Sequence, residues 1–102
     1  MISPSGKKNI ELKTNDIVFV AMTGEAEKNK KPSSEWRFHL DLYKYCKCNA
    51  IVHAHSKFSV ICSCLFKEIP SFHYMIALIE AKSIKVAKYA LFGSKNLSKN
   101  IL

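Results

Sequence analysis

A polar run at residues 23–34, rich in Glu, Lys, Asn and Ser, interrupts the chain between a β-type and an α-type apolar pattern. Before the run, residues 16–20 are β-branched and aromatic, which predicts a short strand. After it, the string Pro-Ser-Ser at residues 32–34 is typical of a helix start, with serine as the cap. The run is therefore predicted to be a long loop between a strand and a helix.

The helix after the run is predicted to extend to about Tyr45. Trp36, Leu40 and Tyr43 fall at positions i, i+4 and i+7, which places them on one face of a helix. We expect this face to pack on the rest of the chain.

Strand-like and helix-like segments continue towards the C-terminus. We expect a strand at 49–55, a mostly apolar helix at 56–66, some helix within 71–80, a half-buried strand at 83–90 and a last helix that starts at Gly93-Ser94. The last helix has an apolar face of Leu97 and Ile101, and the chain stops at Leu102 without a C-cap. Because short helices are marginal alone, we expect this one to belong to a larger domain. The alternative is a frayed tail.

Length and composition indicate one globular domain at most, since the chain has 102 residues, 48% hydrophobic and 24% charged. No stretch approaches the roughly 20 apolar residues that a membrane span needs, and the N-terminus lacks an export signal. We therefore expect a cytoplasmic protein with no membrane partner. Its cysteines are expected to be reduced thiols.

The net charge of +8 raises the question of a polyanion partner. Fifteen of the 16 basic residues are lysines, spread from Lys7 to Lys99, and only Arg37 has the planar fork that suits base edges. We interpret the charge as a lysine-rich solvated surface and predict no nucleic-acid partner. Nucleic-acid binding would instead give a steeply salt-dependent affinity.

His53 and His55 form the sharpest local motif. In a strand, residues two apart point to the same face with Cα atoms about 6.6 Å apart, so two imidazoles can converge on one metal ion. Catalytic zinc sites use three protein ligands and leave a position for water or substrate. The pair is therefore either two of three zinc ligands or two ordinary strand histidines.

Four cysteines compete for the same metal, in Cys-x-Cys pairs at 46/48 and 62/64. Structural zinc sites usually have wider pairs, and residues i and i+2 of a helix face apart, as Cys62 and Cys64 would. We therefore interpret the cysteines as small core thiols.

Glu35 lies in the first turn of its predicted helix. Unpaired N–H groups and the helix dipole favour an anion there, which explains a carboxylate without any function. A carboxylate beside a bound metal is also suited to moving a proton. His39, four residues later, is interpreted as a structural residue outside the site.

Two serine-rich turns are candidates for binding phosphate: Ser3-Pro4-Ser5-Gly6 and Ser33-Ser34. Hydroxyls and free N–H groups at a glycine turn or a helix start direct donors at an anion. The alternative is a plain turn and a plain helix cap. Tyr74, beside His73, is by pattern alone a boundary aromatic.

Taken together, five strings resemble the L-fuculose-phosphate aldolase family of the class II aldolase and adducin-head superfamily. They are Ile-Ser-Pro-Ser-Gly at 2–6, Lys-Pro-Ser-Ser-Glu-Trp-Arg-Phe-His at 31–39, Ala-Ile-Val-His-Ala-His at 50–55, Ile-Pro-Ser-Phe-His-Tyr-Met-Ile at 69–76 and Tyr-Ala-Leu-Phe-Gly at 89–93. Their order and spacing agree with the family along essentially the whole chain. The long serine-glutamate string followed by His-x-His is the most specific part.

The resemblance implies an α/β fold in which a largely antiparallel sheet is flanked by helices. It implies that residues 1–102 are a single partial class II aldolase domain carrying the central metal-site segment. The family's N-terminal helices, its Gly-Asn phosphate turn and its C-terminal part, with a third zinc histidine in a His-His-Gly segment, are expected outside this sequence. The family forms homotetramers with active sites between subunits.

The chemistry that the resemblance implies is zinc-dependent retro-aldol cleavage of a sugar phosphate, L-fuculose 1-phosphate, into dihydroxyacetone phosphate and L-lactaldehyde. Zn²⁺ would act as a Lewis acid on the oxygens of the dihydroxyacetone phosphate unit. The implied residues are His53 and His55 as zinc ligands, Glu35 as acid/base and further candidate ligand, Tyr74 as acid for the aldehyde oxygen from a neighbouring subunit, and Ser5, Gly6, Ser33 and Ser34 as phosphate-binding positions.

Two alternatives stay open within the superfamily. A pentulose-phosphate 4-epimerase would use the same metal and the same retro-aldol chemistry. A non-catalytic binding or assembly module, like the adducin heads, would keep the fold without the metal chemistry.

Overall fold

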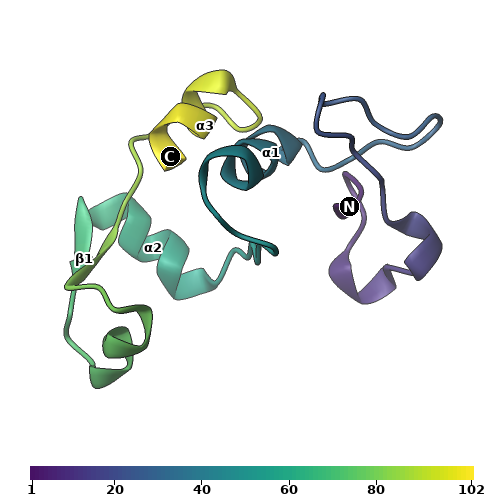
Figure 1. Cartoon of the computed structure of the whole chain (residues 1–102). Coiled ribbons are helices and arrows are strands. Elements are labelled where there is room, and N and C mark those ends of the chain that lie inside the picture. The colour runs from purple at the N-terminus through teal and green to yellow at the C-terminus, as the bar shows by residue number, and fades with distance from the viewer. The chain divides into compact units, whose positions relative to one another are not determined.

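The computed structural model describes residues 1–102, apart from the side chain of Ala77. It forms two compact units, one built from Met1–Ile51 and Tyr89–Leu102 and the other from Val52–Lys88. Figure 1 shows their helices and strands along the chain.

The first unit is organised by backbone pairing of its N-terminal segment. Ile2 and Val18 exchange both N–H···O bonds, each 2.9 Å long, and Val18 is fully buried. On the other side, Ser5 N donates to Lys31 O at 3.0 Å, and Ser33 N donates to Ser3 O at 2.9 Å. The N-terminal segment therefore joins the two ends of the region that contains the polar run.

The strand predicted at 16–20 is present only as single bridges. Val18 pairs with Ile2, and Val20 pairs with Ala26. The backbone at Thr14–Asp16 forms a short 3-10 helix instead, which takes up the start of the predicted strand. A second 3-10 helix covers Asn9–Glu11.

The polar run begins as a tight turn rather than an open loop. Ala21 N donates to Glu25 O at 2.8 Å, and Glu27 N donates to Phe19 O at 2.9 Å, so the run folds back on the preceding segment. Gly24 has a φ of +96° in this turn, a backbone conformation that L residues rarely adopt. The rest of the run connects to the helix, as predicted.

Helix α1, Trp36–Tyr45, confirms the predicted helix. It buries Phe38 and Leu40, and Trp36, Leu40 and Tyr43 line a cavity of about 360 Å³ within this unit. The predicted serine cap is wrong in detail. Glu35 occupies the N-cap position, without a side-chain cap bond.

Helix α3, Lys95–Ile101, confirms the predicted last helix and packs beside α1 (Figure 1). Ser94 is its N-cap, and its hydroxyl accepts a hydrogen bond from Leu97 N at 3.1 Å. Its most buried residue is Ser98, at 2% exposure, whose hydroxyl donates to the Asp41 carboxylate at 2.5 Å. A part-buried hydrogen bond to a carboxylate therefore joins α3 to α1.

The second unit contains helix α2, Lys57–Leu65, which confirms the helix predicted at 56–66 and has Ser56 as its N-cap. Strands β1, Glu68–Pro70, and β2, Ser83–Lys85, pair antiparallel with Ile69 opposite Ile84. The half-buried strand predicted at 83–90 is thus limited to its first three residues. A 3-10 helix, Tyr74–Ile79, accounts for the helix predicted within 71–80.

The strand predicted at 49–55 is wrong as a paired element. Residues 50–56 join no strand or bridge in the part of the chain that the structure describes. A strand is defined by hydrogen bonds to a neighbour, and the local β-type pattern of Ala-Ile-Val-His-Ala-His supplies none.

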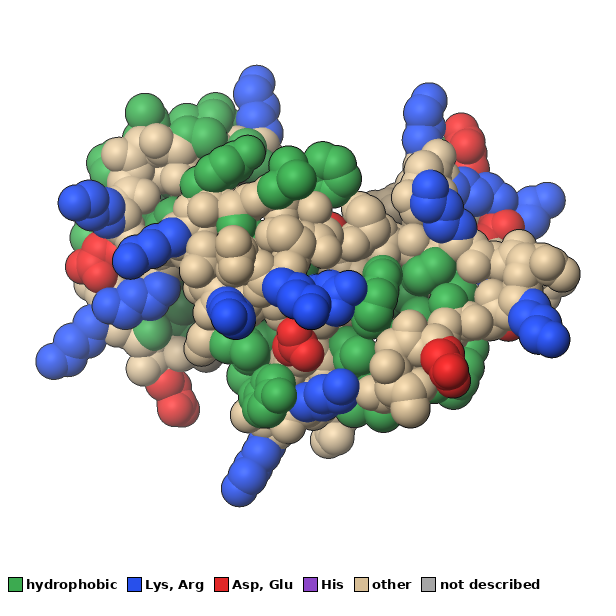
Figure 2. Space-filling model, turned by 90° about the horizontal axis from the view of Figure 1, so that it is seen from above, with side chains coloured by type: hydrophobic (Ala, Val, Ile, Leu, Met, Phe, Trp, Pro, Cys, Tyr) green, Lys and Arg blue, Asp and Glu red, His purple; other side chains and the backbone are tan. Residues whose placement is uncertain are grey.

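Figure 2 shows Lys and Arg side chains scattered over one face of the chain, with hydrophobic side chains between them. Among the described residues, every helix is too short or too polar to cross a bilayer.

One carboxylate near the N-terminal pairing carries a shifted pKa. The Lys7 ammonium, 2.6 Å from Asp16 Oδ2, and the Lys13 N–H, 2.7 Å from the same oxygen, lower the pKa of Asp16 below its ordinary value of 3.8. A lowered folded pKa adds stability above the unfolded pKa, and that stability is lost as the pH falls through the folded pKa.

We therefore predict that Asp16→Asn lowers the melting temperature near neutral pH but not at a pH well below 3.8. Thermal melts of both proteins across this pH range measure the effect. Glu11→Gln, which neutralises an exposed carboxylate on the neighbouring 3-10 helix, is the control. A melting-temperature difference for Asp16→Asn that persists unchanged at low pH would contradict the assignment.

Candidate functional site

The two serine-rich turns lie next to each other in the first unit. Pro4 pairs with Pro32 in an antiparallel bridge, and hydrogen bonds on either side join Ser3 to Ser33 and Ser5 to Lys31. These turns are 30 residues apart in sequence. Backbone pairing, rather than sequence proximity, brings their serines together.

The first turn is open on the side of its glycine. Gly6 has a φ of +77°, and a Cβ at this position would meet no heavy atom within 4 Å. Ser5 is half-buried and Gly6 is exposed. The backbone at Gly6 is therefore accessible to a small ligand.

The second turn leads directly into α1. Ser33 O accepts from Trp36 N at 3.1 Å, and the Ser33 hydroxyl accepts from Glu35 N at 3.3 Å. Ser34 is exposed, whereas Ser33 is half-buried. The turn thus presents serine hydroxyls at the N-terminal end of a 10-residue helix, where unpaired N–H groups and the helix dipole favour an anion.

Glu35 is the N-cap of α1 and is half-buried. Its φ of −96° and ψ of 10° place it outside the helix proper, so its side chain leaves from the turn rather than from the helical surface. The helix dipole stabilises the charged form of a carboxylate at this end. The position therefore suits a negatively charged side chain.

His53 and His55 lie together in the second unit, just before α2. Their ring centroids are 4.9 Å apart with an interplanar angle of 39°, and both residues are exposed. Imidazole nitrogens are ordinary zinc ligands, and two rings this close fit a shared ion. Their role as ligands stays a prediction.

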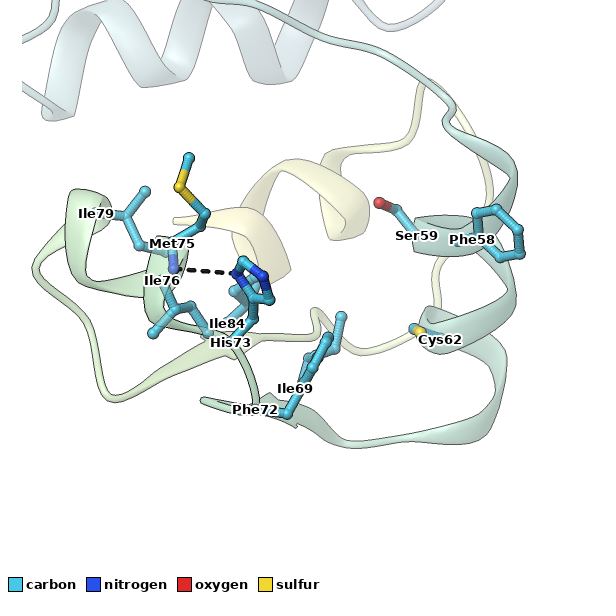
Figure 3. Close-up of a pocket in the computed structure, with 10 residues that line it drawn as sticks. All are labelled: Phe58, Ser59, Cys62, Ile69, Phe72, His73, Met75, Ile76, Ile79 and Ile84. Carbon is cyan, nitrogen blue, oxygen red and sulfur yellow. Dashed lines mark hydrogen bonds between the residues drawn. The ribbon is translucent and has the colours of Figure 1, made fainter.

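Tyr74 opens the 3-10 helix of the second unit and is 81% exposed. Its ring lies 4.5 Å from the His73 ring. His73 Nδ1 accepts from Met75 N at 3.2 Å, drawn as a dashed line in Figure 3. His73 also lines an apolar cavity of about 350 Å³ with Ile69 and Phe72, so its contacts are those of a structural residue.

The residues that the sequence analysis set aside also have structural contacts. His39 stacks on the buried Phe38, with ring centroids 4.5 Å apart. All four cysteines are free thiols, and Cys48 Sγ lies 3.7 Å from Leu42 O. His39 therefore has the contacts of a structural residue. The prediction of core thiols is wrong, because two of the four cysteines are exposed and the other two are only half-buried.

One residue beside the serine turn was missed by the sequence analysis, which used it only to mark a helix start. Gly93 has a φ of +68° and lies directly against the backbone of Ser34. A glycine before a helix has many explanations, so the sequence held no signal for this contact.

Comparisons with known proteins agree with the site's motifs. The family model for the class II aldolase and adducin N-terminal domain matches residues 1–102. The chain is 45% identical, over 103 residues, to a 5-methylthioribulose-1-phosphate/5-deoxyribulose-1-phosphate aldolase from Rhodospirillum rubrum, covering 100% of this chain and 47% of that protein. It is 41% identical over 102 residues to L-fuculose phosphate aldolase from Escherichia coli K12, covering 99% and 47%.

A solved structure of L-fuculose 1-phosphate aldolase superposes with a TM-score of 0.83 and 38% identity, covering 96% of this chain and 47% of that chain. This match confirms the expected fold, a partial class II aldolase-like α/β arrangement with an antiparallel sheet and flanking helices. The chain spans about half the length of the relatives it matches.

The structure separates the stabilising roles of the two adjacent serines. We predict that Ser33→Ala lowers the free energy of unfolding by about 0.5–1.5 kcal/mol, the net worth of one hydrogen bond, because the Glu35 N–H loses its acceptor. Ser34→Ala is the matched control, since its exposed hydroxyl has no hydrogen bond recorded in the described structure. Denaturant unfolding of both variants measures the difference, and equal losses would contradict this account of Ser33.

Proposed function

Because the chain belongs to the class II aldolase and adducin N-terminal domain family, we propose that it carries part of the active site of a metal-dependent aldolase acting on ketose 1-phosphates. The observation that carries the proposal is the pairing of the Ser5-Gly6 turn with the Ser33-Ser34 turn, immediately before Glu35. The relatives at 41–45% identity are named as aldolases of sugar phosphates, which supports the same reaction class here.

The paired turns supply the phosphate contacts in this proposal. The hydroxyls of Ser5, Ser33 and Ser34 donate hydrogen bonds to phosphate oxygens, and the accessible Gly6 backbone lets the anion approach closely. Neutral donors held by a backbone ladder need little rearrangement on binding. The phosphate group would therefore fix the position of the reacting carbons relative to Glu35.

His53 and His55 are proposed to hold a divalent metal, with Zn²⁺ the expected ion, and Glu35 is a further candidate ligand. The fit rests on two imidazoles with ring centroids 4.9 Å apart on an exposed segment. When bound, such an ion supplies Lewis-acid stabilisation of negative charge on substrate oxygens.

The proposed reaction breaks the bond between C3 and C4 of a 2-ketose 1-phosphate. The C4 hydroxyl loses its proton and becomes an aldehyde, while the electron pair of the broken bond passes to the fragment made of C1 to C3. Protonation at C3 then gives dihydroxyacetone phosphate. Glu35 is proposed to carry the proton to and from C3, as a carboxylate placed to act as a general acid and base.

Tyr74 is proposed to exchange the proton of the C4 oxygen. Its 81% exposure leaves the phenol available to a substrate held outside its own unit. This fits the expected homotetramer, in which the tyrosine would reach the site of a neighbouring subunit.

The preferred substrate is proposed to be L-fuculose 1-phosphate, cleaved to dihydroxyacetone phosphate and L-lactaldehyde. A second candidate is favoured by the Rhodospirillum rubrum relative, named for 5-methylthioribulose 1-phosphate and 5-deoxyribulose 1-phosphate and 45% identical to this chain. Both candidates share the ketone and the 1-phosphate and differ only beyond C3. The proposed site residues contact the shared part.

We predict that His53→Ala and His55→Ala each weaken zinc binding, because each removes a proposed ligand. Loss of a residue that only hydrogen-bonds to a ligand costs roughly 10–100-fold in metal affinity, and loss of a ligand itself should cost more. Zinc titration and metal analysis of the purified protein measure this. His73→Ala is the control histidine, and its zinc affinity is expected to stay unchanged. Zinc binding that survives in both His53→Ala and His55→Ala would sink the assignment.

Glu35→Gln separates the two roles left open for the carboxylate. We predict that it keeps zinc and lowers turnover by about 10²–10⁴-fold, as expected for loss of a general acid/base. The measurement is aldol cleavage with metal content determined on the same sample. Loss of zinc from Glu35→Gln would make the carboxylate a ligand, and normal turnover would remove it from the mechanism.

A substrate panel tests the reaction itself. We predict release of dihydroxyacetone phosphate from L-fuculose 1-phosphate at a higher kcat/KM than from 5-methylthioribulose 1-phosphate, with no epimerisation of pentulose phosphates. Epimerised pentulose phosphate as the main product would favour the 4-epimerase alternative. Absence of turnover and of zinc binding would favour a non-catalytic module.

A further inference from the structure

We infer that Gly93 is a positioning residue for the phosphate-binding serine turn and for Glu35, acting through the peptide bond between Ser34 and Glu35. The inference rests on the proposed phosphate role of Ser33 and Ser34. It adds a residue from the far end of the chain that contacts neither the expected metal nor the expected substrate.

The contact is closer than any side chain permits. A Cβ built on Gly93 would lie 2.7 Å from the carbonyl oxygen of Ser34 and 3.6 Å from its carbonyl carbon. The neighbour is backbone, which cannot swing aside as the end of a side chain can. Any residue other than glycine therefore pushes either the Ser34 peptide or the segment before α3.

The segment before α3 has little freedom to move away. Ser94 N donates to Leu91 O at 3.1 Å, and the Ser94 hydroxyl caps α3 through Leu97 N. Further along α3, the buried Ser98 is joined to Asp41 of α1 by the part-buried hydrogen bond. Because α3 is tied to α1 beyond this point, much of the displacement is expected to fall on the Ser34 peptide.

Moving the Ser34 carbonyl also moves the N–H of Glu35. The peptide unit is planar, so the Ser34 C=O and the Glu35 N–H rotate together. That N–H donates to the Ser33 hydroxyl at 3.3 Å. A shift of one peptide plane therefore re-aims the Ser33 hydroxyl and changes the direction in which Glu35 leaves the turn.

A second glycine, Gly24, provides a control for the effect of backbone strain alone. Gly24 also has a positive φ, +96°, but its nearest neighbours are the ring atoms of Trp36 at 3.1 Å rather than backbone. Gly24→Ala therefore introduces the same left-handed backbone strain. Its new Cβ meets a side-chain ring and not the backbone of the serine turn. Gly93→Asn provides the converse comparison, because Asn tolerates positive φ but still has a Cβ.

The test measures the affinity of the whole chain for inorganic phosphate. A phosphate titration is monitored by NMR at the amide signals of Ser33, Ser34 and Glu35. Gly93→Ala and Gly93→Asn are expected to raise the phosphate Kd at least about tenfold, the effect of losing one hydrogen bond to a charged group. Gly24→Ala is expected to lower the melting temperature and leave the phosphate Kd within about twofold, since a strained backbone position costs stability without reaching the serine turn.

The double variant Ser33→Ala/Ser34→Ala distinguishes failure of this inference from failure of the proposed function. If the double variant binds phosphate as the parent does, or if the parent shows no phosphate response at these amides, the proposed phosphate site is wrong and the inference falls with it. If the double variant loses binding but both Gly93 variants keep it, the site stands and the role of Gly93 is overturned. If neither Gly93 variant folds, Ser98→Ala tests the inference instead. This variant removes the hydrogen bond that anchors α3 to α1, so it should raise the phosphate Kd. An unchanged Kd would overturn the inference.

Discussion

Backbone pairing between the N-terminal segment and residues 31–33 is the interaction on which the candidate phosphate site depends. Two N–H···O bonds, from Ser33 to Ser3 and from Ser5 to Lys31, bring together serines that lie 30 residues apart. The pairing also fixes the point at which the chain enters α1, and hence the place of Glu35 at its N-cap. Because main-chain groups make these bonds, side chains remain available for a ligand.

Elements with strong local signals were predictable from the sequence. The helices at Trp36–Tyr45, Lys57–Leu65 and Lys95–Ile101 each follow a serine-containing start and have a 3.6-residue apolar period or a high apolar content. The motif strings also predicted the family, because a serine-glutamate string with His-x-His downstream is far more specific than either part. In both cases the information lies in short runs of sequence, read singly for each helix and in combination for the family.

Features set by distant residues were not predictable in the same way. Residues 49–55 have a β-type pattern, yet pairing requires a partner that the local sequence does not specify. Conversely, Glu68–Pro70 forms a strand by pairing with Ser83–Lys85, although its own sequence contains a proline. The close approach of Gly93 to Ser34 is of the same kind, because only the packing of α3 on α1 reveals why the position has no side chain.

In the proposed function, the net charge of +8 and the serine turns would contribute differently to binding a sugar phosphate. Scattered lysines raise the local concentration of any anion, and salt screens this effect over a Debye length of roughly 8 Å at physiological ionic strength. They do not orient the anion. In the proposed function, hydroxyl and backbone N–H donors on the paired turns would orient the phosphate at short range, where screening is weak. The lysine-rich surface would then add mainly to the rate of encounter, and orientation of the phosphate would come from the geometry around Ser33 and Ser34.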